Sequence, residues 1–266
     1  MLTSDGRRNA IRGRLAERGE VEIAALAEEF AVSEMTIRRD LEALEERGVA
    51  RRVRGGAIST VSRSYEPPFA ARSQEAREAK ARIAEVAAGF VEYGETAILD
   101  VGSTTLALAR ALRDRGGLTI LTPSVNAAVE LSGVPTTRVI LTGGIVRPGE
   151  LSLVGDLAEQ TFQRFNCDVL FLGVGGIDAA KGLTEYNLDD TRVKRAALGA
   201  ASRCVVLADR SKLDRVCLAQ VATLEQIDVL ITDAESDHPV LAAVRDAGAE
   251  VVSVPSHQSH EWQENE

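Results

Sequence analysis

Two groups of residues in this 266-residue chain have types and spacings suited to chemistry. The first lies within residues 31–55 and consists of arginines, hydroxyl residues and a methionine: Ser33, Met35, Thr36, Arg38, Arg39, Arg51, Arg52 and Arg54. The second lies within residues 100–212 and combines acids, lysines, polar residues and glycines: Asp100, Gly102, Ser103, Thr104, Thr105, Gly143, Gly144, Gly175, Gly176, Asp178, Glu185, Asn187, Lys194 and Lys212. Arginine and hydroxyl side chains suit the phosphates and base edges of DNA. Glycine-rich loops with hydroxyls suit a small anion.

The first group is positioned by a predicted three-helix module. Apolar spacing predicts one helix that ends near Gly19 and a second over residues 23–30. Ser33 can then cap a third helix, which runs to about Arg47. Residues 49–58 contain a glycine pair and predict a short hairpin. Helix, helix, three-residue turn, helix and ribbon is the order of an α+β winged helix-turn-helix domain.

Angular positions on the third helix predict which side meets DNA. At about 100° per residue, Leu41 and Leu44 lie within about 40° of Ile37, and these three define the buried side. Met35 and Arg39 fall close to the opposite side. We therefore expect the first two turns of this helix to enter the major groove, which is how such helices usually dock.

The charge distribution favours duplex DNA as a partner of this module. Residues 1–60 hold eleven arginines and eleven acids, so the net charge of −9 belongs to the rest of the chain. Four of these arginines, at positions 47, 51, 52 and 54, fall within eight residues that contain no acid. This local basic patch could reach a phosphate or the minor groove. The alternative is an ordinary three-helix bundle with solvated arginines.

The composition excludes several other classes of protein. No apolar run approaches the roughly 18 residues of a membrane helix, and the polar N-terminus does not resemble a signal peptide. Cys167, Cys204 and Cys217 are odd in number and far apart, which indicates reduced thiols in the cytoplasm. The three histidines occupy no metal-ligand motif. We therefore expect no membrane segment, metal or cofactor.

From about residue 70 the pattern changes to helices that alternate with short apolar strands, which predicts an α/β domain with a mainly parallel sheet covered on both faces. The predicted domains are residues 1–58 and 70–255, joined by a polar linker over 59–69 and followed by a polar tail over 256–266. The strand candidates are residues 96–100, 118–121, 138–141, 169–174, 204–208, 229–232 and 250–254.

Three glycine-rich loops follow strand ends, where open parallel sheets bind ligands. Residues 100–105 open a helix and suit an anion, although an ordinary capped turn is the alternative. Residues 142–144 could simply form a tight turn. Residues 173–178 lack the G-x-G-x-x-G spacing, so a dinucleotide is disfavoured. Lys194 and Lys212 could face a phosphate, with Asp178, Glu185 and Asn187 reading sugar hydroxyls, although surface solvation explains most single lysines.

At these residues the chain resembles the DeoR family of transcriptional regulators over nearly its whole length. Residues 32–41, Val-Ser-Glu-Met-Thr-Ile-Arg-Arg-Asp-Leu, and residues 51–57, Arg-Arg-Val-Arg-Gly-Gly-Ala, are similar to the family's helix-turn-helix and wing. The family's sensor domain is resembled at residues 100–105, 142–144, 173–176, 187, 193–195 and 207–212. The chain departs from the usual residue at Arg54, where His is more common, at Pro123, where Asn is common, and at Asp190, where Glu is common.

This resemblance implies a repressor of a sugar catabolic operon that a phosphorylated sugar releases from operator DNA. It further implies a sensor domain similar to ribose-5-phosphate isomerase, with Ser103, Thr104 and Thr105 holding the phosphate and Lys194 and Lys212 adding charge. We expect a homodimer or homotetramer, because one head that neutralises a few phosphates binds weakly. The alternative is a sugar-phosphate isomerase-like enzyme with a DNA-binding appendage.

Overall fold

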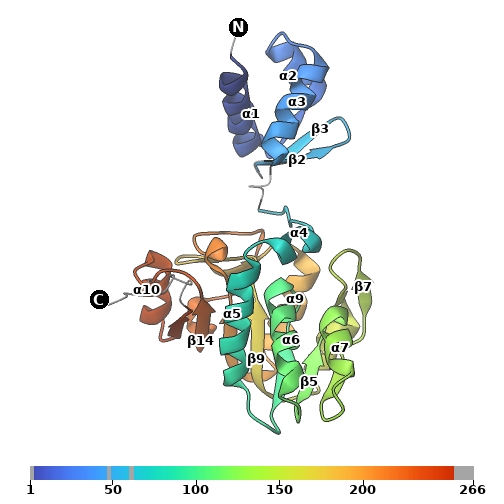
Figure 1. Cartoon of the computed structure of the whole chain (residues 1–266), viewed down its shortest axis with the longest axis vertical. Coiled ribbons are helices and arrows are strands. Elements are labelled where there is room, and N and C mark those ends of the chain that lie inside the picture. The colour runs from blue at the N-terminus through green and yellow to red at the C-terminus, as the bar shows by residue number, and fades with distance from the viewer. Residues whose placement is uncertain (1–2, 47–48, 60–62, 255–266) are drawn as a thin grey trace, which may run out of the picture. The chain divides into compact units, whose positions relative to one another are not determined.

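The computed structural model of the chain describes residues 3–46, 49–59 and 63–254, and the chain divides into two compact units between Pro67 and Pro68 (Figure 1). Ser59 ends the last strand of the first unit, and Phe69 begins the first helix of the second. The first residue of the predicted linker over 59–69 therefore belongs to a strand, and its last residue belongs to a helix. Arg47 and the predicted tail over 256–266 lie outside the described residues.

The first unit has the predicted winged helix-turn-helix order. Its elements are α1 (Ser4–Arg18), β1 (Glu20–Glu22), α2 (Ile23–Glu29), α3 (Glu34–Glu46), β2 (Ala50–Val53) and β3 (Gly56–Ser59). Gly19 ends α1 in the left-handed region at φ 77°, and the Ser33 hydroxyl accepts the Thr36 amide at 3.2 Å, which confirms the predicted cap. Ile37, Leu41 and Leu44 are buried, as the angles predicted.

The ribbon of this unit differs from the two-stranded hairpin that the sequence predicts. β1 adds a third strand, so that the sheet order is β1-β3-β2 with antiparallel pairing. Only one residue of β1, Val21, is apolar and buried. A three-residue strand with one buried position has no detectable periodicity, because alternation needs at least four residues to be recognised.

The second unit contains a seven-stranded sheet in which every neighbouring pair is parallel. In sheet order the strands are β15 (Glu250–Ser253), β14 (Val229–Thr232), β12 (Ala201–Leu207), β9 (Cys167–Gly173), β4 (Thr96–Leu99), β5 (Thr119–Thr122) and β6 (Arg138–Leu141). These are the seven strands that the apolar runs predict, with small differences at their ends. The predicted α/β class is therefore confirmed.

Helices cover both faces of this sheet (Figure 1). They are α4 (Phe69–Gln74), α5 (Arg77–Ala87), α6 (Ser103–Ala111), α7 (Val125–Ser132), α8 (Asp156–Phe162), α9 (Leu188–Leu198) and α10 (Pro239–Asp246), with short 3-10 helices η1 (Ala88–Phe90), η2 (Leu112–Asp114), η3 (Arg210–Lys212) and η4 (Leu224–Gln226). Strand β9 shows the division: Val169 and Phe171 pack with α5 and α6, whereas Leu170 and Leu172 pack with α8, α9 and α10. Because both faces are covered, the strands are mostly apolar, and their charged residues lie near the strand ends.

Two small antiparallel elements were not predicted from the sequence. β7 (Ile145–Arg147) pairs with β8 (Ser152–Val154), and β11 (Gly182–Glu185) lies between β10 (Gly176–Asp178) and β13 (Ala219–Ala222). Each strand has three or four residues, at or below the shortest length at which alternation can be recognised. Within the described ranges, no helix has the length and apolar character needed to cross a membrane.

Candidate DNA and effector sites

Helix α3 presents one side to solvent, and that side carries the predicted base-reading residues. Met35 is 60% exposed although it is apolar, and Arg38 and Arg39 are also exposed. Arg38 forms an i,i+4 ion pair with Glu34 at 3.3 Å. Thr36 is half-buried because its hydroxyl bonds to that of Ser33 at 2.9 Å. The helix therefore offers a methionine and two arginines at its N-terminal end.

A hollow of about 440 Å³ lies between α3 and the turn of the β2–β3 wing. It is lined by Ile23, Arg38, Arg52, Val53, Arg54, Gly55 and Gly56. The wing turns through Gly55, which has φ +88°, and the Gly55 carbonyl accepts the amide of Ile23 at 2.9 Å. The fold thus brings an arginine of the helix together with two arginines of the wing.

Arg52 differs from the other wing arginines because two carboxylates of α3 already hold it. Its guanidinium lies 2.5 Å from Glu42 and 3.0 Å from Glu45, and its backbone amide donates to Glu45 at 2.9 Å. Hydrogen bonding to Glu45 raises the pKa of Arg52, and Glu42 adds to the effect. Arg52 therefore braces the wing against α3, whereas the exposed Arg54 has no ion pair within the described residues.

Replacement of Arg54 by alanine is expected to weaken binding to all duplexes alike and to lower the slope of log affinity against log salt by about one unit per half-site. Arg52→Ala is the matched comparison. Its charge is already neutralised by Glu42 and Glu45, so it should change the slope less than Arg54→Ala does. Fluorescence anisotropy over a salt series measures both slopes. A larger slope change for Arg52→Ala would contradict this assignment.

Asp40 is a residue of the first unit that the sequence reasoning missed. It is buried on α3, and its carboxylate accepts from Arg7 at 2.5 Å and from Arg8 at 3.1 Å, both on α1. On the helical wheel Asp40 lies about 60° from Ile37, on the buried side. An acid at that angle on the helical wheel predicts a buried ion pair. Here the pair fixes the orientation of α3 relative to α1.

In the second unit, the sheet order places a topological switch point between β4 and β9. From β4 the chain proceeds outward through β5 and β6, and then returns to β9 on the opposite side of β4 and continues through β12, β14 and β15. Ligands of open parallel sheets bind outside the carboxyl ends of the strands at such a point. Residues 100–105 follow β4 and residues 173–176 follow β9, so the strongest loop candidates meet there.

The N-terminus of α6 at this switch point has no side-chain cap. Gly102 precedes the helix at φ +130°, a conformation that L side chains rarely adopt. Thr105 donates its hydroxyl to the Gly102 carbonyl at 3.0 Å, while the hydroxyls of Ser103 and Thr104 form no hydrogen bond within the described residues. Free amides, free hydroxyls and the helix dipole together suit an anion.

Lys194 lies beside this terminus but is fully occupied by protein groups. Its ammonium donates to Asp100 and to the Gly173 carbonyl at 2.9 Å, and it lies 3.3 Å from Glu185. Burial opposes its charge, but Asp100 and Glu185 raise its pKa, so it stays protonated. Lys194 thus uses two of its N–H donors within the protein and holds two buried acids together. Its predicted role, to add positive charge near a bound phosphate, stays a prediction.

Several other predicted effector residues also have partners within the protein. Asp178 accepts two amides of its own hairpin, at 2.9 and 2.8 Å, and Asn187 caps α9. A Cβ on Gly144, Gly175 or Gly176 would lie within 3 Å of another part of the chain. These glycines thus allow close packing of the protein on itself rather than the approach of a ligand.

Lys212 remains available, and so does Gly143, which is exposed at φ +77°. The Lys212 side chain is largely buried, yet its ammonium has no hydrogen bond or ion pair within the described residues.

The sequence reasoning missed the buried Lys80, which donates to the carbonyls of Arg72 and Glu75 at 2.5 and 2.7 Å. Its position in an amphipathic helix gave no signal, since lysine is ordinary there.

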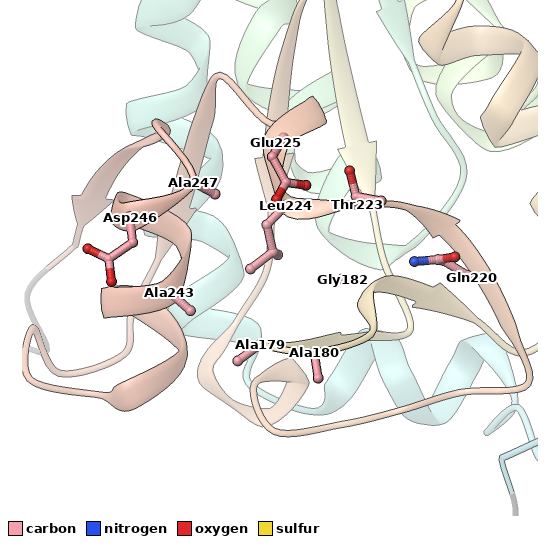
Figure 2. A pocket seen from close by; sticks show the side chains of 10 residues that line it. All are labelled: Ala179, Ala180, Gly182, Gln220, Thr223, Leu224, Glu225, Ala243, Asp246 and Ala247. Carbon is pink, nitrogen blue, oxygen red and sulfur yellow. The ribbon is translucent and has the colours of Figure 1, made fainter.

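A second hollow, of about 430 Å³, lies between the β10–β11 hairpin, η4 and α10 (Figure 2). Small side chains such as Ala180 and Ala243 line it, together with the acids Glu225 and Asp246. None of the predicted effector residues lines this hollow. In the part of the chain that the structure describes, no three His, Cys, Asp or Glu residues are grouped to hold a metal ion.

Comparison with known families identifies both units. The DeoR-like helix-turn-helix domain matches residues 7–63, and the DeoR C terminal sensor domain matches residues 75–234. The chain belongs to the DeoR family. This DeoR-family protein is 35% identical to the putative aga operon transcriptional repressor of Escherichia coli O157:H7, over 93% of each chain. It is 36% identical to the transcriptional regulator GlpR of Haloferax volcanii (86% and 90% covered) and 32% identical to the glycerol-3-phosphate regulon repressor of Escherichia coli K12 (90% and 95%).

These relatives are all named as transcriptional regulators, so this DeoR-family chain is a DNA-binding transcriptional regulator rather than an enzyme. Among solved structures, ribose 5-phosphate isomerase A from Methanocaldococcus jannaschii matches 52% of this chain and 55% of its own, with 18% identity and a TM-score of 0.40. The predicted alternative, an isomerase-like enzyme with a DNA-binding appendage, has no support from the relatives over the full length.

Proposed function

We propose that this protein represses a sugar or sugar-phosphate catabolic operon and that a phosphorylated sugar releases it from operator DNA. The uncapped α6 N-terminus at the β4/β9 switch point carries this proposal, because it offers free donors where parallel sheets bind ligands. The names of the aga and glycerol-3-phosphate repressors support the same class of operon. The protein would act in the cytoplasm, where the operator is.

In this proposal the phosphate binds the hydroxyls of Ser103 and Thr104 and the backbone amide of Thr105, whose own hydroxyl donates to Gly102. Lys212 supplies positive charge. Asp100, Glu185 and Lys194 form a buried cluster beside this proposed effector site, and the cluster holds the loops after β4 and β9 in place. Asp100 or Glu185 could accept a hydrogen bond from a sugar hydroxyl only through a carboxylate lone pair that does not already interact with Lys194. The effector must bind more tightly to one arrangement of the DNA-binding units than to another. Equal affinity for both arrangements would leave the equilibrium between them unchanged.

DNA contact in this proposal comes from Met35, Arg38 and Arg39 in the major groove and from Arg51 and Arg54 on the wing. Ser33 and Thr36 fix the start of α3, and Arg52 braces the wing. Two or four chains would assemble as a homodimer or homotetramer, so that paired heads bind repeated half-sites with useful affinity.

The function is tested by release from an operator duplex that the protein itself selects from a random library. At least one of glycerol 3-phosphate, ribose 5-phosphate and fructose 6-phosphate is expected to weaken wild-type binding by about 5- to 150-fold, the usual range of allosteric coupling. Ser103→Trp should bind the operator normally but lose this response, because the indole fills the anion cradle. Ser132→Trp, on the exposed end of α7, is the matched control.

Two outcomes would contradict this proposal. A normal response in Ser103→Trp would mean that the anion site lies elsewhere. Isomerisation of ribose 5-phosphate by the purified protein, followed by product analysis, would restore the enzyme as the better account.

A further inference from the structure

Helix α4 is the first element of the sensor unit after the segment that joins the two units. It has six residues, and none of them is fully buried. Short helices are stable only through tertiary contacts, so α4 must be held by its neighbours. It lies against α6, on the edge of the sheet at which α6 begins (Figure 1).

Charged groups hold α4 in place together with Phe69, which is partly buried and packs against the core of the unit. Arg72 of α4 is ion-paired with Glu150, in the turn between β7 and β8, and Glu150 is buried. The ammonium of Lys80 holds the last carbonyls of the helix, those of Arg72 and Glu75. A buried ion pair depends strongly on geometry, because its attraction offsets the cost of desolvation only when partners and hydrogen bonds are well placed.

The ion pairs continue from α4 to the start of α9. Arg147 of β7 lies 4.0 Å from Glu150 and 2.5 Å from Asp190, in the first turn of α9. Ser152 donates its hydroxyl to the other oxygen of Asp190 at 2.8 Å. The exposed fraction of the side chain is 19% for Arg147 and 5% for both Glu150 and Asp190, so solvent screens these charges little.

The chain of ion pairs ends at Asp190, close to the buried cluster of Asp100, Glu185 and Lys194. Asp190 precedes Lys194 by one turn of α9, and its charge contributes to the raised pKa of that lysine. Lys194 in turn holds Glu185 and Asp100, which is three residues before Ser103, the first residue of α6. A change in the position of Asp100 on effector binding would therefore change the charge interactions of α9 and of Arg147. Through Glu150 it would also change the contacts of α4.

We propose that the chain Arg72–Glu150–Arg147–Asp190 couples effector binding at the α6 N-terminus to the position of α4, and through α4 to the DNA-binding unit. This inference rests on the proposed function, because it needs an effector bound there. The four residues are positioning residues: they contact neither the operator nor the effector. Discrete rearrangement of such packed ion pairs is a physical basis for two-state coupling.

The test cuts the chain at two points with neutral residues of similar size, Glu150→Gln and Asp190→Asn. The probe is whichever of glycerol 3-phosphate, ribose 5-phosphate or fructose 6-phosphate releases the wild-type protein. Both variants should bind this compound within about twofold of the wild type in calorimetry, and should bind the operator without it. Release should fall from the wild-type 5- to 150-fold to about twofold or less. Asp156→Asn, which breaks the exposed pair with Arg192 at 3.4 Å, should be released normally.

If these residues had only a structural role, the variants would be less stable, but binding of the compound and release from the operator would change together. Normal binding of the compound with loss of release is therefore the decisive result. Normal release of both variants, or loss of compound binding in both, would overturn the coupling while leaving the proposed function intact. If no compound releases the wild-type protein, the proposal fails together with the effector part of the proposed function. Should the variants not fold, amide hydrogen exchange of the wild-type protein decides: unchanged protection of residues 69–74 on addition of the compound would also overturn it.

Discussion

Replacement of Arg39 by alanine is expected to remove most of the sequence preference of this regulator while its fold stays intact. Arg39 is exposed on the side of α3 opposite Ile37, which is fully buried. One well-placed arginine contact to a base is worth about 1–3 kcal/mol, and a dimer loses it at each half-site. Affinity for the selected operator should therefore fall by about 5- to 150-fold per half-site, and affinity for a scrambled duplex much less.

The measurement is the ratio of operator to scrambled-duplex affinity at fixed salt, because affinities depend steeply on salt. Arg77→Ala is the control, since it removes an exposed arginine from α5 in the sensor unit. An unchanged ratio for Arg39→Ala would show that the angular assignment of α3 is incorrect, and Arg38 would then be the residue to test next.

Replacement of Lys194 by methionine is expected to lower the free energy of unfolding of the sensor unit by about 3–5 kcal/mol, the usual cost of breaking a buried ion pair. The methionine keeps most of the volume but removes the ammonium that lies between the buried acids Asp100 and Glu185. Burial raises the pKa of Asp100, and without Lys194 nothing of opposite charge counteracts this rise. Urea unfolding followed by circular dichroism measures the difference.

The pH dependence separates this charge effect from a simple packing defect. In the variant, the folded pKa of Asp100 lies above its unfolded value, so protonation at low pH favours the folded state. The stability gap to the wild type should narrow as pH falls from about 8 to 5. Arg192→Met, which breaks the exposed pairs with Asp156 and Glu159, should cost about 0–1 kcal/mol. A gap for Lys194→Met that is equally small, or independent of pH, would contradict the buried ion-pair assignment.

Local sequence patterns predicted which side of α3 is buried more completely than they predicted the contacts of the polar residues in the second unit. The buried side of α3 follows from the spacing of Ile37, Leu41 and Leu44 alone, because helical geometry fixes which side chains share a face. The ends of α1 and the start of α3 follow from Gly19 and Ser33 for the same local reason.

The partners of charged side chains could not be predicted in this way. Arg52 is seven residues from Glu45, and Lys194 is 94 residues from Asp100, yet both pairs are in contact. No helical or strand period relates such positions. From the sequence, both cations were therefore predicted to face a phosphate. Their partners in the structure are carboxylates of the same chain.

The sequence by itself determined the three helices of the first unit, the seven strands of the main sheet, the class of each unit and the family, since all of these depend on short-range periodicity, caps and contiguous motifs. Only the tertiary structure decided which polar residues are free to bind a ligand. That freedom depends on whether another part of the chain already occupies a donor or acceptor, as it does for Lys194 but not for Lys212. The occupancy of a polar group is a property of three-dimensional neighbours, which the spacing of residues along the chain does not encode.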